Sequence, residues 1–321
     1  MSPPPQQSRG RGGLAFRLGP VPVIMPWSGV LGVLLIAYLW SGTFARATDQ
    51  PGQEYVVALI FAVLFYVSIL LHEVGHAAMA RACGFPVHQI VLWVFGGFTS
   101  YERSRESAGR EGLIAAAGPA ASLLLGGVCW LLTSADLVGS DPSVLAVVAA
   151  LAWSNIFLGV FNALPGLPLD GGAVLKSIVW AATSNQHRAA VIAAWSGRVV
   201  AVVVVVLVLL PSLLAGRRPE LTPVVFALLI GGYLFVQANQ ALRTATMSAR
   251  VPALSAADLA RRVVAVAADQ PLALTLRQQA AASAQAFVVV DAVGRPVALS
   301  HDEAVGAVPE QRRPWVPSGS V

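Results

Sequence analysis

The run of residues 55–71 is apolar on every face, carries no charged side chain, and leads directly into His72. A helix of this composition is typical of a membrane span. Glu73 follows, and His76 stands four residues after His72. Positions i and i+4 share one helix face, so both imidazoles can reach one metal ion. At about 1.5 Å of rise per residue, His72 lies roughly 25 Å along such a helix. The sequence therefore predicts a metal site still within membrane depth.

The rest of the chain fits a membrane protein. Hydrophobic residues make up 56% of the chain and charged residues 12%, whereas a soluble domain carries about a quarter charged residues. We predict an all-α polytopic protein of about six spans in the cell membrane. The expected spans are 21–44, 55–83, 111–133, 144–163, 189–214 and 223–242.

Basic residues indicate the orientation of these spans. Most arginines fall in the loops expected on one side, which predicts that both termini are cytoplasmic. The net charge of +5 is scattered over loops and helix ends, so we expect no nucleic-acid partner.

Composition also divides the chain into parts. Residues 1–20 read as a disordered cytoplasmic tail and 21–245 as the membrane domain. Residues 251–310 alternate helical and β-rich stretches, which predicts a small α/β module, and 311–321 read as a flexible tail.

One segment between spans predicts β structure. Residues 87–95 are β-branched and aromatic, and Gly96, Gly97 and Phe98 follow. This pattern indicates a short strand or hairpin in or beside the membrane. A strand edge beside the metal site could receive an extended peptide by strand addition.

Zinc requires a third protein ligand, and Asp170 is the best candidate. It is one of few acidic residues expected at membrane depth, where an unpaired carboxylate is costly. It follows Pro165 and Pro168 and precedes Gly171 and Gly172, so the backbone is broken there and can turn the side chain inward. The alternative is that Asp170 only caps the helix that starts after it.

Two separated motifs together resemble the site-2 protease family of intramembrane zinc metalloproteases. The first is His72-Glu73-Val74-Gly75-His76. The second is Asn162-x-x-Pro165-x-x-Pro168-x-Asp170-Gly171-Gly172, and the resemblance extends to Gly96, Gly97 and Ala117-Gly118-Pro119. It covers residues 20–245.

The resemblance implies one Zn²⁺ per chain, held by His72, His76 and Asp170, with Glu73 as general base and acid. It implies that Asn162 binds the substrate backbone and that the strand containing Gly96, Gly97 and Phe98 lies along the substrate. The expected substrate is a transmembrane segment of a single-span regulator such as an anti-sigma factor.

The C-terminal module resembles a single CBS domain. About sixty residues are marginal for independent stability, so we expect this module to pair with a second copy or to dock on the rest of the chain. The CBS resemblance adds an adenine nucleotide as a partner to test, besides the lipid bilayer.

A non-proteolytic metal sensor or transporter remains the alternative function. Such a protein would have no need for a non-ligating carboxylate at Glu73.

Overall fold

The computed structural model describes residues 12–94, 96–102, 107–216, 220–250 and 262–321. Most of the expected N-terminal tail, 1–11, and the link 251–261 lie outside the described residues. The chain divides into two compact units, Met1–Ala249 and Arg250–Val321, and each is described by itself.

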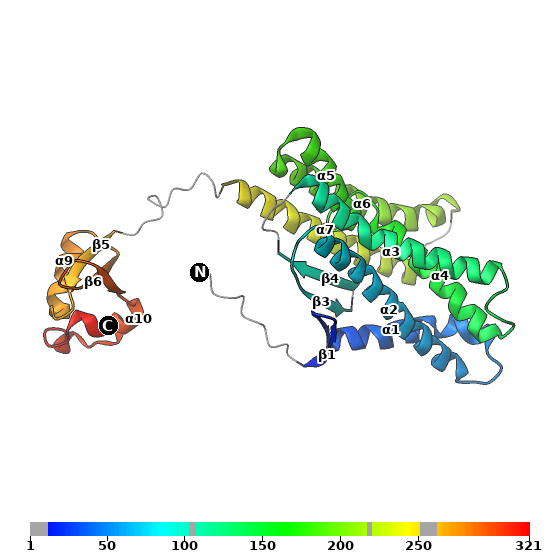
Figure 1. Cartoon of the computed structure of the whole chain (residues 1–321), viewed down its shortest axis with the longest axis horizontal. Coiled ribbons are helices and arrows are strands. Elements are labelled where there is room, and N and C mark those ends of the chain that lie inside the picture. The colour runs from blue at the N-terminus through cyan, green and yellow to red at the C-terminus, as the bar shows by residue number, and fades with distance from the viewer. Residues whose placement is uncertain (1–11, 95, 103–106, 217–219, 251–261) are drawn as a thin grey trace. The chain divides into compact units, whose positions relative to one another are not determined.

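Long apolar helices dominate the first unit (Figure 1). In chain order they are α1 (Trp27–Phe44), which the short helix η1 (Ala45–Ala47) extends, α2 (Gln53–Ala82), α3 (Ala108–Ser134), α4 (Pro142–Asn162), α5 (Asp170–Thr183), α6 (Gln186–Leu214) and α7 (Leu221–Arg250).

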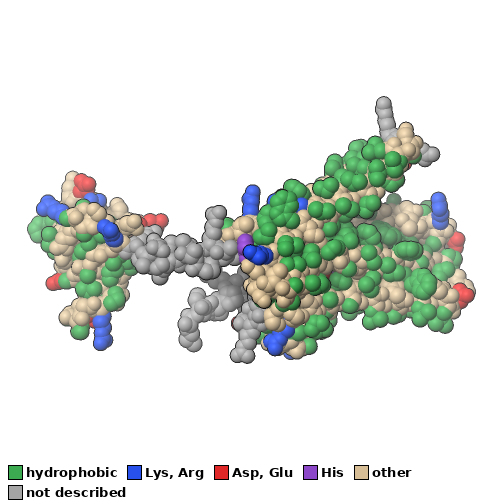
Figure 2. Space-filling model, turned by 90° about the horizontal axis from the view of Figure 1, so that it is seen from above, with side chains coloured by type: hydrophobic (Ala, Val, Ile, Leu, Met, Phe, Trp, Pro, Cys, Tyr) green, Lys and Arg blue, Asp and Glu red, His purple; other side chains and the backbone are tan. Residues whose placement is uncertain are grey.

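Six of the described helices are long and apolar enough to cross a membrane, namely all of these except α5. The prediction of about six spans is confirmed. Large apolar side chains such as Leu124, Trp153 and Phe157 are more than two-thirds exposed, as expected where lipid replaces water. Figure 2 shows hydrophobic side chains along this unit and charged ones gathered toward its two ends. This is a multi-pass membrane protein.

A four-stranded sheet lies against these helices. Its strands are β1 (Gly13–Leu18), β2 (Val21–Pro26), β3 (Val87–Trp93) and β4 (Gly96–Tyr101), in that spatial order. β1–β2 and β3–β4 are antiparallel hairpins, and β2 pairs with β3 in parallel. β4 is therefore an edge strand, and it packs against α2.

The N-terminal hairpin corrects two expectations. Residues 13–18 are a paired strand rather than part of a disordered tail, and the first span begins at Trp27 rather than at 21. Gly19 turns the chain with a φ of 60°, and β2 is apolar because it lies inside the sheet. Hydropathy alone counts a buried strand followed by a helix as one long span, since both are apolar.

α2 is the central helix, and it packs against α1, α3 and α4. Its first half contributes Phe61 to an aromatic cluster with Trp40, Phe44 and Phe65. Phe44 and Phe61 are fully buried. Its second half carries the His72–His76 motif.

The second unit is a small α/β module. Its elements are β5 (Val263–Ala267), α9 (Leu272–Ala281), β6 (Ala286–Val290), β7 (Pro296–Leu299), α10 (Asp302–Ala307), η3 (Glu310–Arg312) and η4 (Ser318–Ser320). The sheet order is β5-β6-β7, with β5 parallel to β6 and β7 antiparallel.

The expected flexible tail 311–321 is packed instead. Ser318 is 1% exposed and hydrogen-bonds Thr275 at 2.7 Å. Val316 and Val321 pack against the core of Leu272 and Phe287. A module this small needs the apolar side chains of its last residues to complete its core.

Candidate metal centre

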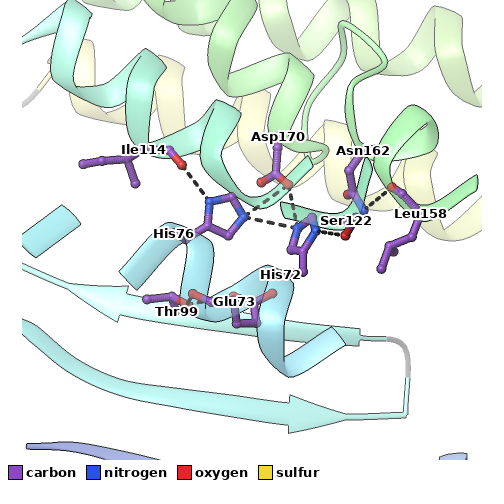
Figure 3. A network of polar contacts seen from close by, with 9 residues as sticks. All are labelled: His72, Glu73, His76, Thr99, Ile114, Ser122, Leu158, Asn162 and Asp170. Carbon is purple, nitrogen blue, oxygen red and sulfur yellow. Dashed lines mark hydrogen bonds and ion pairs between the residues drawn. The ribbon is translucent and has the colours of Figure 1, made fainter. Parts of the chain in front are cut away.

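The second half of α2 turns three functional side chains into the protein. His72, Glu73 and His76 are 5%, 5% and 8% exposed. Asp170, the first residue of α5, approaches the two histidines from the other side (Figure 3). Residues nearly a hundred positions apart in the chain thus meet at one point.

The three donor atoms converge as zinc ligands do. His72 Nε2 lies 3.2 Å from His76 Nε2, and Asp170 Oδ2 lies 3.1 Å and 3.3 Å from these two nitrogens. Two ligand atoms each about 2.0–2.1 Å from a tetrahedral zinc stand about 3.3–3.4 Å apart. The trio therefore fits one Zn²⁺, with a fourth position for water or substrate.

Hydrogen bonds at the far side of each ring fix the imidazole orientations. His76 Nδ1 donates to the carbonyl of Ile114 at 2.7 Å. Because a carbonyl only accepts, the proton of a neutral His76 is on Nδ1 and Nε2 keeps its lone pair for the metal. His72 Nδ1 lies 2.9 Å from the Ser122 hydroxyl, which is 1% exposed. Both partners belong to α3, so this helix holds both rings.

Glu73 stands beside the trio without belonging to it. Its carboxylate Oε2 accepts a hydrogen bond from Thr99 Oγ1 of β4 at 2.8 Å. Among the described residues, the metal-binding group of histidine, cysteine and acidic side chains is formed by His72, His76 and Asp170 alone. A buried, non-ligating carboxylate at this place suits proton transfer.

The backbone of α3 approaches the rings of His72 and His76 closely at Gly118. A Cβ placed on Gly118 would lie 2.6 Å from His72 Nε2 and would also press on His76 Nε2. Only a glycine leaves room for both ring tips at this position.

The broken segment before α5 aims Asp170 at the histidines. Leu167 N donates to the carbonyl of Ala193 on α6 at 3.0 Å, and Gly197 packs against the Leu167 carbonyl. Gly172 packs against the backbone of Gly166. The N-cap of α5 is Leu169, and no side chain caps this end. The alternative role of Asp170 as a helix cap is therefore wrong.

An ion pair joins α5 to α3. Lys176 Nζ lies 2.7 Å from Glu111 Oε1, and both side chains are about 15% exposed. The pair therefore joins α3, which holds the histidine rings, to α5, which supplies Asp170.

The predicted substrate-binding residues lie around the site, and their role stays a prediction. Gly96, Gly97 and Phe98 are on β4, and Phe98 is 50% exposed. Asn162 ends α4, and its amide nitrogen donates to the Leu158 carbonyl at 3.0 Å.

Sequence reasoning missed the residues that support the site. A lone serine in an apolar span is a signal that could have indicated Ser122. Thr99 carries no such signal, and the Ile114 contribution is a backbone carbonyl that every residue type offers.

Fold and site together define a membrane protein with six candidate spans, a His-His-Asp group that could hold a metal ion, and an adjacent glutamate. Residues 60–139 and 135–210 match Peptidase family M50. This match agrees with the predicted resemblance to site-2 proteases over that part of the chain.

Curated relatives agree with this assignment. The chain is 32% identical to the candidate zinc metalloprotease sll0528 of Synechocystis sp. over 77% of its length. It is 34% identical to the candidate zinc metalloprotease Rip3 of Mycobacterium tuberculosis over 64% of its length. The matches span 62% and 54% of these relatives. Among solved structures, the site-2 protease from Methanocaldococcus jannaschii is 22% identical with a TM-score of 0.48, covering 72% of this chain and 95% of that one.

Proposed function

We propose that this protein is an intramembrane zinc metalloprotease that cleaves a transmembrane segment of a single-span membrane protein. The observation that carries the proposal is the convergence of His72, His76 and Asp170 at zinc-ligand spacing, with Glu73 buried beside them. The site lies on a helix long and apolar enough to span the membrane.

The chain's own residues supply binding and proton transfer. Zinc, when bound, polarises the scissile carbonyl and makes a nearby water more acidic. Glu73 takes a proton from the attacking water and delivers it to the nitrogen of the leaving amine. Ser122 and the Ile114 carbonyl keep both imidazoles oriented for the metal.

The edge strand β4 is the expected docking place for substrate. A transmembrane helix satisfies its own backbone groups, so it must open locally before a peptide bond is accessible. Pairing of the opened segment with β4 near Gly96, Gly97 and Phe98 would replace the lost hydrogen bonds. Asn162 would bind the substrate backbone near the scissile bond.

Finer aspects of the proposal concern partners and placement. The expected substrates are membrane-tethered regulators such as anti-sigma factors, cleaved in regulated intramembrane proteolysis. Both termini are proposed to be cytoplasmic. The α/β module is proposed to be CBS-like, with a second copy of itself and an adenine nucleotide as partners.

The test is cleavage of a single-span model substrate by the detergent-purified full chain. Glu73→Gln should lower the rate by about 10²- to 10⁴-fold and leave zinc bound, whereas Glu54→Gln at the opposite end of α2 should cleave normally. Undiminished cleavage by Glu73→Gln would reject the mechanism.

Metal analysis tests the ligand set, and cleavage by the zinc-loaded protein separates the two functional candidates. Asp170→Ala should lose zinc on dialysis while the exposed-loop control Asp136→Ala retains it. A wild-type protein that binds zinc stoichiometrically and cleaves no transmembrane substrate would favour the sensor or transporter.

A further inference from the structure

We propose that Thr99 positions Glu73 for proton transfer and thereby joins the general base to the strand on which substrate lies. This inference rests on the proposed protease function. It assigns Thr99 a positioning role in that reaction.

The contacts place Thr99 directly on the base. Thr99 Oγ1 lies 2.8 Å from Glu73 Oε2 and 3.1 Å from the Glu73 backbone carbonyl. A threonine hydroxyl has one proton, and a carboxylate is the stronger acceptor of the two. Among the described residues, Thr99 is the hydrogen-bond donor to this carboxylate. A 5% exposed carboxylate depends on that donor for its orientation.

The strand passes close to both ends of the Glu73 carboxylate. Gly97 and Thr99 are two residues apart on β4, so they face the same side of the sheet, toward Glu73. A Cβ on Gly97 would lie 2.6 Å from Glu73 Cγ and 2.9 Å from Oε1. Thr99 therefore fixes Oε2, and the missing side chain at Gly97 leaves space at Oε1. Oε1 remains as the oxygen that can take a proton.

The same strand is the free edge of the sheet. β4 pairs with β3 on one side and ends the sheet order on the other. A substrate strand added at that edge takes its position from the β4 backbone. The hydrogen bond from Thr99 also holds the Glu73 carboxylate against β4. The general base and the scissile bond of the substrate would therefore both be positioned by this strand. Misplacing a reacting group by about 1 Å can cost about 10²-fold in rate.

If Thr99 had only a structural role, its hydrogen bonds to Glu73 would serve to hold β4 against α2. That role predicts lower stability, or weaker substrate binding through a displaced strand, and thus a raised KM. Positioning of the base predicts a fall in kcat with KM nearly unchanged, because the contact matters in proton transfer.

The experiment measures kcat, KM and zinc content of the purified full chain on a single-span model substrate. Thr99→Val removes the hydroxyl at nearly constant volume, and Thr99→Ala removes it with less risk of a clash. Thr99→Ser keeps the hydroxyl. Thr133→Val, near the end of α3, is the matched control, because the Thr133 hydroxyl donates to the nearby Trp130 carbonyl at 2.8 Å.

We expect Thr99→Val and Thr99→Ala to lower kcat by about 10- to 100-fold, with one zinc bound per chain as in the wild type. KM should change less than about threefold, and Thr99→Ser should restore kcat to within about threefold of wild type. Wild-type kcat in both hydroxyl-free variants, or a Ser variant no better than Val, would overturn the proposal. An inactive wild-type protein would instead refute the protease function itself.

Discussion

Both halves of α2 carry buried side chains, but the contacts of these side chains differ in kind. In the first half, Phe61 is fully buried among Trp40, Phe44 and Phe65, with ring centroids 4.5 to 5.9 Å apart. In the second half, buried side chains meet polar partners at 2.7 to 3.3 Å. Apolar packing tolerates small shifts, whereas ligand geometry does not.

The partners of the two halves also differ in distance along the chain. The aromatic cluster joins α2 to its neighbour α1. The polar half joins residues 26 to 98 positions apart, drawn from β4, α3 and α5. Substitutions in the first half should therefore affect stability, and those in the second half metal binding and catalysis.

The largest expected effect is a loss of zinc affinity, caused by adding one methyl group at Gly118, which faces the polar half of α2. Gly118→Ala should weaken zinc affinity by more than the about 10- to 100-fold typical of losing one supporting contact, because the new Cβ would displace both ring tips. Alanine favours the helix, so the fold should persist. Zinc competition with a chelator measures the loss.

The matched control is Gly127→Ala on the same helix, where an added Cβ meets no atom within 4 Å. Equal zinc affinity in the two variants would contradict the ligand geometry described here.

Next in size is a stability effect confined to the aromatic half. Phe61→Ala should cost about 3 kcal/mol of unfolding free energy, because a cavity replaces a ring in the cluster. The folded fraction should still bind one zinc per chain. Denaturant titration in detergent measures the stability, with Phe157→Ala as the control, since Phe157 is 68% exposed. A loss of zinc affinity without a loss of stability would erase the distinction between the halves.

The smallest effect concerns a supporting residue of the polar half. Ser122→Ala should weaken zinc binding about tenfold, because the His72 ring loses its hydrogen-bond partner while all three ligands remain. Chelator competition on the purified protein gives the affinity. Unchanged affinity would mean that helix packing alone orients His72.

The sequence predicted the six spans and the His72, His76 and Asp170 set because both leave strong local signals. Apolar runs of span length are unmistakable, the i,i+4 spacing fixes one helix face, and a carboxylate between prolines and glycines at membrane depth is costly without a partner.

Features that depend on tertiary contacts were not predictable. The β1–β2 hairpin was missed because its apolar strand is continuous with an apolar helix. The packing of 311–321 depends on a core that forms only when distant elements meet. The partnership of Thr99 with Glu73 is a contact between a strand and a helix that no local pattern encodes.

The 98-residue separation between His72 and Asp170 has a consequence for biogenesis. The ribosome makes the two histidines and Glu73 of α2 well before it makes Asp170, which begins α5. Until then the two histidines and the glutamate lack that ligand. The candidate metal centre can therefore be completed only after α5 has been made, and the histidine pair alone offers zinc an incomplete ligand set until then.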